Sequence, residues 1–325
     1  MPILKSNFSP KFPFTNKHLS TVFRTIFSSP KVNYDRQRIE TKDQDFLDID
    51  ISSIQSENLA LMIHGLEGSS NSKYIRSTVN FLNRNNIDVI ILNLRGCSGY
   101  INKTFKAYHS GETGDLAFIL QYIEQQYTYK NISLVGFSLG GNVVLKYAGE
   151  QKKNLLNKVS SVVAICPPCD LKGSSEILAK KSNSIYMKRF LNTLISKSVI
   201  KSQMHPEQSL DIHQLKQSKN FKDFDGVFTA PSFGFKDAED YWKKASSKQF
   251  LKDVQVPTYV LSAENDPFLS KSCIPYTIAK EHAFLHLEVP KFGGHIGFID
   301  SWLPSKNTWC EERIEKFITE NLNKQ

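Results

Sequence analysis

The chain has 325 residues, of which 40% are hydrophobic and 22% charged, a composition typical of a folded globular protein and not of a disordered or membrane-embedded one. Its formal net charge of +9 suggests nucleic acid as a partner, but the sequence has no zinc-finger spacing, glycine-rich RNA motif or dense Lys/Arg tract. We therefore expect that the protein binds no nucleic acid. Five scattered cysteines and the lack of a signal peptide or membrane-spanning run favour a cytoplasmic protein.

From residue 37 onward, short β-rich runs alternate with helical patterns. Residues 37–41 and 46–52 flank a polar turn and predict an antiparallel hairpin. Further strands are expected at residues 59–63, 88–93, 132–135 and 159–165, with helices at 72–83 and 114–126. This alternation predicts an α/β protein with a mostly parallel central sheet flanked by helices.

The alternation stops after Pro167-Pro168. A long helical stretch follows, and strands return only at residues 258–262 and 284–289, before a closing helix at 308–321. We therefore expect three parts, namely an N-terminal extension packed on the core (1–36), a core (37–170 and 251–325) and a helical cap inserted into it (171–250). The cap carries six more Lys/Arg than Asp/Glu, which we interpret as a solvated face.

A G-x-S-x-G pentapeptide, Gly136-Phe137-Ser138-Leu139-Gly140, lies between an apolar run and a helix-compatible run. This is the pattern of a nucleophile elbow, in which the serine occupies a tight strand-to-helix turn and its Oγ projects from the sheet edge. The pattern alone is weak, because roughly one random chain in ten of this length would contain it. The pattern indicates a catalytic serine only if the sequence also offers a base and a carboxylate that could activate it.

A base and an orienting carboxylate follow the last two predicted strands. Asp266 comes after the strand at 258–262, and His295 lies in the glycine-flanked loop after the strand at 284–289. The chain order Ser, Asp, His is the one expected of α/β-hydrolases, and the carboxyl ends of parallel strands converge on one crevice. Ser138, Asp266 and His295 are the predicted catalytic residues, with Glu264 as the rival acid.

An oxyanion hole is expected where His64-Gly65-Leu66-Glu67-Gly68-Ser69 follows the strand at 59–63. We expect the backbone N–H groups of Leu66 and Leu139 to be its two donors. The base role is already assigned to His295, so His64 is interpreted as a structural hydrogen-bonding residue at the border of the pocket.

Three other segments suggest different chemistry. Cys166-Pro167-Pro168-Cys169 is a C-x-x-C, but its Pro-Pro pair and its position after a late strand favour packing over redox or metal chemistry. Residues 93–99 lack the spacings of a phosphate-binding loop. Residues 108–115 are expected to cap a helix through Thr113 or Asp115, in preference to contacting substrate. We expect no cofactor and no metal.

Taken together, these motifs resemble the α/β-hydrolase superfamily and, within it, the YheT-like esterases related to embryogenesis-associated hydrolases. The resemblance covers most of the chain and implies that Ser138 is the nucleophile, Asp266 the orienting acid and His295 the general base acting on carboxylic esters. It rests on segments 16–21, 64–69, 93–97, 108–111, 136–142, 263–267 and 293–295, and on Phe224-Asp225 and residues 234–241 in the insertion, where a second tyrosine often follows at the position of Trp242.

The expected function is that of a serine carboxylesterase acting on short- to medium-chain acyl esters through an acyl-enzyme, with the cap shaping acyl-chain selection. A lipase, phospholipase or thioesterase at a membrane surface remains an alternative, as does a non-catalytic ligand-binding protein of the same fold. The expected partner is a small-molecule or lipid ester, and peripheral membrane contact stays open. The sequence does not fix the natural substrate, the oligomeric state, or hydrolysis against acyl transfer.

Overall fold

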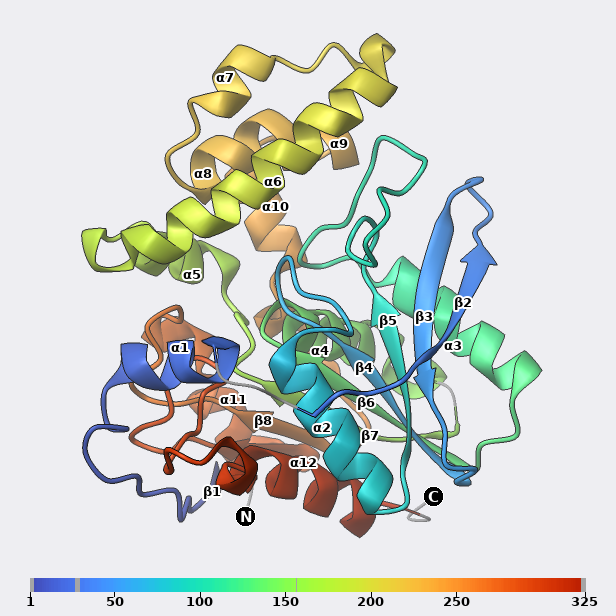
Figure 1. Cartoon of the computed structure of the whole chain (residues 1–325), viewed down its shortest axis with the longest axis vertical. Helices are drawn as coiled ribbons and strands as arrows, with labels where there is room; N and C mark the ends of the chain where they lie inside the picture. The colour runs from blue at the N-terminus through green and yellow to red at the C-terminus, as the bar shows by residue number, and fades with distance from the viewer. Residues whose placement is uncertain (1–2, 27–29, 156, 323–325) are drawn as a thin grey trace.

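The computed structural model describes residues 3–26, 30–155 and 157–322. Within them, one nine-stranded sheet has the order β1-β9-β8-β7-β6-β4-β5-β3-β2 (Figure 1). Strand β3 is antiparallel to both β2 and β5, and all other neighbours are parallel. The strands are β1 (Ile3–Leu4), β2 (Asp35–Glu40), β3 (Phe46–Ser52), β4 (Asn58–Ile63), β5 (Asp88–Asn93), β6 (Asn131–Phe137), β7 (Val159–Ile165), β8 (Thr258–Leu261) and β9 (Leu285–Glu288).

Helices cover both faces of this sheet and one of its ends. They are α1 (Lys17–Ile26), α2 (Lys73–Arg84), α3 (Gly114–Gln126), α4 (Leu139–Gln151), α5 (Leu171–Leu178), α6 (Ser184–Met204), α7 (Ile212–Lys216), α8 (Phe221–Phe224), α9 (Ala230–Phe233), α10 (Ala238–Ala245), α11 (Tyr276–Glu281) and α12 (Trp309–Glu320). The mostly parallel sheet with flanking helices, predicted from the alternating pattern, is confirmed.

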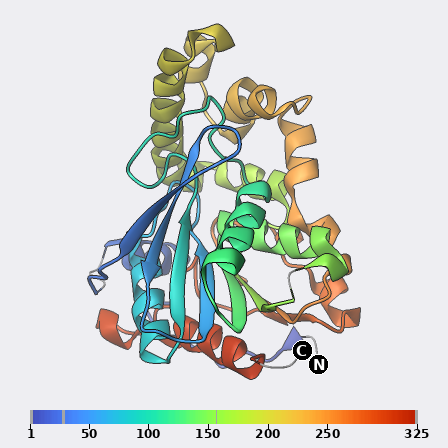
Figure 2. The same cartoon turned by 90° about the vertical axis from the view of Figure 1, so that its right-hand side faces the viewer.

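Side chains of the central strands alternate between two apolar layers. In β4, Leu59, Leu61 and Ile63 pack with α3 and α4 on one face. Ala60 and Met62 pack with α2 and α12 on the other face. Burial on both faces explains why these strands are continuous apolar runs in the sequence, which is typical of parallel sheets. Figure 2 shows the twisted sheet with helices on either side.

The helical insertion, defined here as α5 to α10, lies between β7 and β8 and stands over one end of the sheet (Figures 1 and 2). Its longest element is α6, whose buried Met187 and Leu191 pack against Leu215, Phe224 and Phe228 of the insertion itself. The insertion thus has an apolar cluster of its own, formed by side chains on one face of α6 and by the short helices beside it.

Two N-terminal elements were not expected from the sequence. Strand β1 contributes only Ile3 and Leu4, which pair with Leu287 and Glu288 of β9. Helix α1 has a polar first turn, and its buried residues are Ser20, Thr21 and Phe23. Contact with β9 determines β1, which is too short to show a periodicity. In α1, by contrast, Leu19, Val22, Phe23 and Ile26 recur at helical spacing, a local signal that the sequence reasoning did not use.

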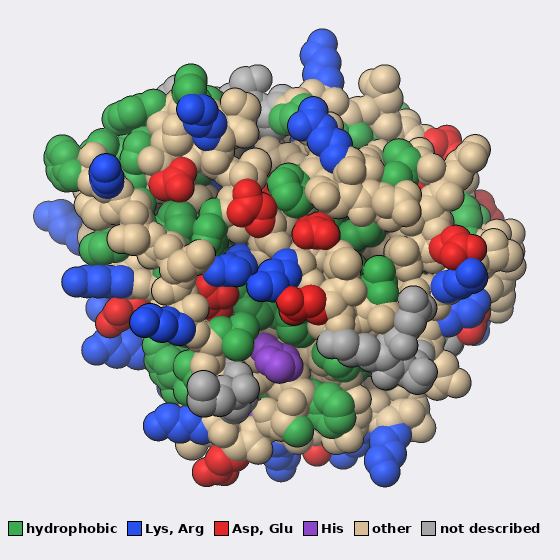
Figure 3. All heavy atoms as spheres, turned by 90° about the horizontal axis from the view of Figure 1, so that it is seen from below, with side chains coloured by type: hydrophobic (Ala, Val, Ile, Leu, Met, Phe, Trp, Pro, Cys, Tyr) green, Lys and Arg blue, Asp and Glu red, His purple; other side chains and the backbone are tan. Residues whose placement is uncertain are grey.

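Charged side chains of both signs lie interspersed on the face opposite the helical insertion (Figure 3). Among the described residues, no helix is both long enough and apolar enough to cross a membrane.

Candidate active site

Ser138 occupies the turn between β6 and α4, and its backbone has φ 51° and ψ −118°. The turn needs glycine on both sides, because a Cβ at Gly136 would lie 2.2 Å from Gly140 O and a Cβ at Gly140 would lie 2.3 Å from Ile63 O. Ser138 N–H donates to Ile165 O (2.8 Å), which fastens the turn to β7. The strained serine therefore projects from the sheet at the start of a helix.

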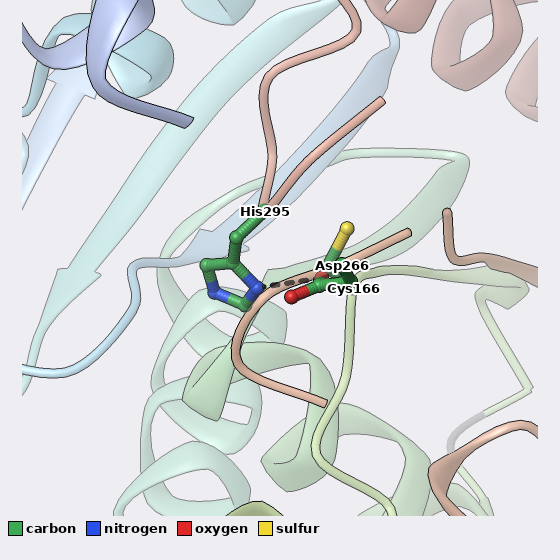
Figure 4. Close-up of side chains that lie close together, drawn as sticks. All are labelled: Cys166, Asp266 and His295. Carbon is green, nitrogen blue, oxygen red and sulfur yellow. Dashed lines mark hydrogen bonds and ion pairs between the residues drawn. The ribbon is translucent and has the colours of Figure 1, made fainter. Parts of the chain in front are cut away.

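The structure brings the three predicted catalytic residues together. His295 Nε2 lies 2.8 Å from Ser138 Oγ, and His295 Nδ1 lies 2.8 Å from Asp266 Oδ2. The Asp266 side chain is 1% exposed, and its Oδ1 accepts a hydrogen bond from Phe268 N–H (2.7 Å). Figure 4 shows the carboxylate directed at the imidazole. Glu264, the rival acid, is exposed to solvent.

The loop that carries His295 is held by helix α1. His295 N–H donates to Thr21 Oγ1 (2.9 Å), and a Cβ at Gly294 would lie 2.6 Å from Lys17 O. Cys166 Sγ accepts a hydrogen bond from Ile296 N–H (3.3 Å) on the other side of the loop. Sequence reasoning missed Thr21 as a site residue, although the segment that contains it contributed to the family resemblance.

The segment after β4 forms a tight turn against Ser138. Gly68 N–H donates to Gly65 O (2.9 Å), and a Cβ at Gly65 would lie 3.2 Å from Ser138 Cβ. Leu66 and Leu139 both line the cavity beside Ser138. Neither of their backbone N–H groups donates to a protein acceptor within residues 3–26, 30–155 and 157–322. Both amides are therefore available to an oxygen atom bound next to Ser138.

His64 is fully buried, and both of its ring nitrogens contact backbone. Leu94 N–H donates to Nε2 (3.1 Å), so the proton resides on Nδ1, which lies 2.8 Å from Gly65 O. Burial lowers the pKa of His64 to about 4, so the ring is neutral at physiological pH. His64 thus orients the Gly65–Leu66 peptide. Because N–H and C=O point in opposite directions in a trans peptide, this contact also orients Leu66 N–H.

A cavity lies between Ser138, His295 and the helical insertion. Ser138, Leu139 and His295 lie at its floor, and Glu67, Tyr108 and Lys197 line one wall. The insertion and the loop after β8 contribute an apolar wall made of Leu178, Phe190, Leu194, Phe221, Phe224, Phe228 and Phe268. A mostly apolar cavity with a few polar groups is typical of a small-molecule site.

Asp225 is the acidic side chain that the insertion brings to this cavity. It begins a π-helical turn (Asp225–Thr229) and accepts hydrogen bonds from Thr229 Oγ1 (2.7 Å) and Trp242 Nε1 (2.8 Å). Burial raises the pKa of Asp225 to about 6. The indole of Trp242 thus fastens the π-turn to α10.

The side chains of Cys166, Asp266 and His295 offer potential metal ligands within 4.8 Å of one another (Figure 4). Their chemistry does not suit a metal ion, because burial raises the pKa of the Cys166 thiol well above its usual value and Asp266 already bonds His295 Nδ1. Burial also raises the pKa of Cys169 to about 12. Both thiols stay protonated at neutral pH, which agrees with a packing role for the C-x-x-C.

The predicted cap of helix α3 is wrong. Thr113 occupies the N-cap position, but its side chain caps no backbone N–H and donates instead to Glu150 Oε2 (2.8 Å). Asp115 Oδ1 pairs with Arg95 Nη2 (2.8 Å), and Arg95 also binds Asp43 and Asp45. Thr113 and Asp115 are therefore engaged in tertiary contacts, and the local bond at the helix start comes from Glu112, whose Oε1 accepts from Gly114 N–H (2.8 Å).

Comparison with known proteins agrees with this geometry. A family model described as alpha/beta hydrolase fold matches residues 59–301. The chain is 30% identical over 323 residues to "Putative esterase YheT" of Escherichia coli (strain K12), covering 98% of this chain and 94% of that protein. It is 26% identical over 327 residues to phospholipase ABHD3 of Bos taurus, covering 98% and 79%.

Among solved structures, esterase Pf2001 of Pyrococcus furiosus superposes with a TM-score of 0.57 at 16% identity, covering 89% of this chain and 91% of that one. At this low identity, the likeness to esterase Pf2001 concerns the fold alone. From the family model, the relatives and the sheet order, the chain belongs to the α/β-hydrolase fold family and, within it, to the esterase and lipase branch that includes YheT.

Proposed function

We propose that the chain is a serine carboxylesterase that hydrolyses short- to medium-chain acyl esters through an acyl-enzyme. The observation that carries the proposal is the pair of 2.8 Å contacts joining Ser138 Oγ, the two ring nitrogens of His295 and Asp266 Oδ2. Asp266 holds the proton on Nδ1 and leaves Nε2 free to accept the Ser138 proton.

In the proposed reaction, Ser138 Oγ bonds to the ester carbonyl carbon while its proton passes to His295 Nε2. The carbonyl oxygen becomes an oxyanion, which the Leu66 and Leu139 amides stabilise. The tetrahedral intermediate then collapses, and the leaving alcohol takes the proton from Nε2. Water, deprotonated by the same nitrogen, attacks the acyl-Ser138 ester, and a second collapse releases the carboxylic acid and restores the Ser138 hydroxyl.

We also propose the division of the chain into an N-terminal extension (1–36), a core (37–170 and 251–325) and a cap (171–250). The apolar wall of the cavity supports a role for the cap in binding the acyl chain, since Phe190, Leu194 and Phe228 all belong to the helical insertion. Covering the site in this way also excludes water from the reacting groups.

Hydrolysis of p-nitrophenyl esters from acetate to palmitate, by the protein and by Ser138→Ala, tests the proposal. Loss of a single nucleophile typically costs several orders of magnitude in kcat, so we expect a fall of about 10⁴-fold or more. The chain-length optimum then reports the depth of the cavity. Ser138→Ala with undiminished activity would contradict the proposal.

A phospholipase is the second candidate, supported by the likeness to phospholipase ABHD3 and by the apolar cavity. Turnover of phosphatidylcholine vesicles that exceeds turnover of p-nitrophenyl butyrate would favour it. If a serine-reactive phosphonate fails to label the folded protein, a non-catalytic ligand-binding role is favoured instead.

A further inference from the structure

The turn that carries Leu66 N–H contains a strained residue with an unusual set of contacts. Gly65 and Gly68 close the turn, and Glu67 has φ +56°, whereas Leu66 has a negative φ. Glu67 therefore occupies the third position of a type II turn, where glycine or asparagine is normally required. A glutamate in this conformation persists only where its surroundings hold it.

Tyr108 holds Glu67 by both its backbone and its side chain. The Tyr108 hydroxyl accepts a hydrogen bond from Glu67 N–H (3.0 Å) and donates one to Glu67 Oε1 (2.7 Å). Burial raises the pKa of Tyr108 well above its usual value, so the phenol keeps the proton that it donates. This fixes the Leu66–Glu67 peptide, while His64 holds the preceding Gly65–Leu66 peptide, which bears Leu66 N–H. The backbone of Leu66, which joins the two peptides, is therefore held from both sides.

Lys197 of the helical insertion holds the other carboxylate oxygen. Its Nζ lies 2.7 Å from Glu67 Oε2, and the two side chains are 26% and 7% exposed. Burial acts to lower the pKa of Lys197, but the neighbouring Cys97 and Glu67 outweigh it, so the pKa is raised and the ammonium stays charged. Lys197 belongs to α6, so this ion pair joins the longest helix of the insertion to the turn after β4.

We infer that Glu67, held by Tyr108 and Lys197, is a positioning residue that aims the Leu66 amide at the developing oxyanion and makes this alignment depend on helix α6. The inference rests on the proposed function, since it assigns Leu66 N–H to the oxyanion hole. Lys197 also has an electrostatic effect. The buried carboxylate of Glu67, one residue from the Leu66 amide, would repel the oxyanion, and the ammonium of Lys197 offsets this repulsion.

The test compares Lys197→Met with Lys188→Met, which removes an exposed lysine from the same helix. With p-nitrophenyl butyrate as substrate, we expect Lys197→Met to lower kcat by about 10- to 100-fold, somewhat less than removal of an oxyanion donor, with KM unchanged within about twofold. Lys188→Met should match the unsubstituted protein. Lys197→Arg, which keeps the charge, should recover most of the lost kcat.

An aliphatic trifluoromethyl ketone provides a second readout, because its adduct with a serine carries an oxyanion. Its inhibition constant should rise in Lys197→Met by the same factor as kcat/KM falls. If Lys197 only shapes the cavity wall, KM and the chain-length optimum would change instead, with kcat and the inhibition constant preserved. That outcome would overturn the inference.

Glu67→Gly separates the charge pair from other effects of Lys197. Glycine adopts a positive φ without strain, so the turn is retained while the carboxylate is removed. In the Glu67→Gly background, Lys197→Met should cause no further loss of kcat beyond about twofold. An equal loss in both backgrounds would show that Lys197 acts independently of Glu67, and the inference would be wrong.

Ser138→Ala distinguishes failure of the inference from failure of the proposed function. If Ser138→Ala is inactive while Lys197→Met keeps full kcat, only the inference fails. If Ser138→Ala keeps full activity, the proposed function fails, and the inference fails with it. Equal melting temperatures and circular dichroism spectra for Lys197→Met and Lys188→Met would establish that lost activity does not reflect unfolding.

Discussion

At the scale of single residues, the candidate site depends on backbone positions that few side chains tolerate. Ser138, Glu67, Cys166 and Ile296 all have positive φ, between 49° and 58°, and all lie at or beside the cavity floor or the catalytic loop. A positive φ costs a non-glycine residue conformational free energy, so it persists only where surrounding contacts hold the backbone in place. Residues of this kind cluster at functional sites. Here the nearby hydrogen bonds of His64, Tyr108 and Thr21 supply that support.

Asp266 and Glu264 provide a direct test of the acid assignment. Asp266→Asn should lower kcat by about 10⁴-fold, because an amide at this place favours the wrong tautomer of His295. Glu264→Gln should change kcat by less than twofold, since Glu264 is exposed and its backbone N–H bonds Pro290 O independently of the side chain. Steady-state kinetics on p-nitrophenyl butyrate would compare the two variants. The reverse ranking would move the acid role to Glu264.

Asp225 should make stability depend on pH. Its pKa in the folded chain is raised from 3.8 to about 6, so its protonated form stabilises the fold below pH 4 and this contribution is lost as pH rises through 6. The loss corresponds to about 3 kcal/mol in the free energy of unfolding. Asp225→Asn, which lacks the ionisation, should gain about that much relative to the unsubstituted protein between pH 4 and pH 7.

Urea unfolding of both proteins at four pH values would measure this difference. His64 contributes the opposite slope, because its lowered pKa costs stability as pH falls from 6.5 towards 4. That contribution is common to both proteins and cancels in the difference. Parallel pH profiles for the two proteins would exclude Asp225 as the titrating group.

At the scale of elements, sequence reasoning found most elements that have a local pattern and none that depend on a distant contact. The β2–β3 hairpin, the strands at 88–93 and 159–165 and helix α3 have periodicities that their own residues carry. Strand β1 is defined by its partner β9. Helix α1 was missed although Leu19, Val22, Phe23 and Ile26 recur in it at helical spacing. The cap of α3 was wrong because Thr113 and Asp115 bond Glu150 and Arg95 of other segments, whereas the neighbouring Glu112 bonds the first N–H of the helix.

The same distinction applies to the candidate site. Ser138, Asp266 and His295 follow recognisable strand ends, so their meeting could be expected from the order of the strands. Tyr108, Lys197 and Thr21 act through tertiary contacts with the turn and the loop. No spacing in the sequence encodes those contacts, and only the folded chain reveals them.

Helix α6 should control acyl-chain selection. Leu194 lines the cavity, so Leu194→Trp should fill part of the apolar wall and lower kcat/KM for p-nitrophenyl decanoate at least about 10-fold relative to the acetate. Thr193→Trp adds the same bulk at an exposed neighbouring position and should leave the profile unchanged. An unaltered decanoate-to-acetate ratio in Leu194→Trp would place the acyl chain elsewhere.

At the scale of the whole molecule, distant parts of the chain meet around the candidate base. Arg24 of α1 donates to Ile296 O and Gly297 O (both 3.4 Å) and pairs with Glu311 of α12. Asn265 Nδ2 donates to Thr15 O (3.2 Å), beside Asp266. The segment before the core is therefore a structural part of the site, even though no catalytic role is proposed for any of its residues.

Thr21→Val tests this dependence. Valine keeps the shape of threonine but removes the oxygen that accepts the His295 N–H, which leaves a buried donor unpaired. We expect kcat to fall about 10-fold and the free energy of unfolding to fall by about 1–3 kcal/mol. Thr25→Val, at an exposed position of the same helix, should affect neither quantity. An unchanged kcat in Thr21→Val would mean that the loop holds its own conformation.

The contact between Thr21 and His295 spans 274 residues of sequence, and the ion pair between Arg24 and Glu311 spans 287. During synthesis from the N-terminus, the serine turn emerges long before the residues that would activate it. A nascent chain thus holds the proposed nucleophile, Ser138, before it holds the proposed base, His295, or the contacts that orient His295. Under the proposed function, hydrolytic activity would therefore begin only after residues 295 and 311 have left the ribosome, and shorter nascent chains would carry an inert serine.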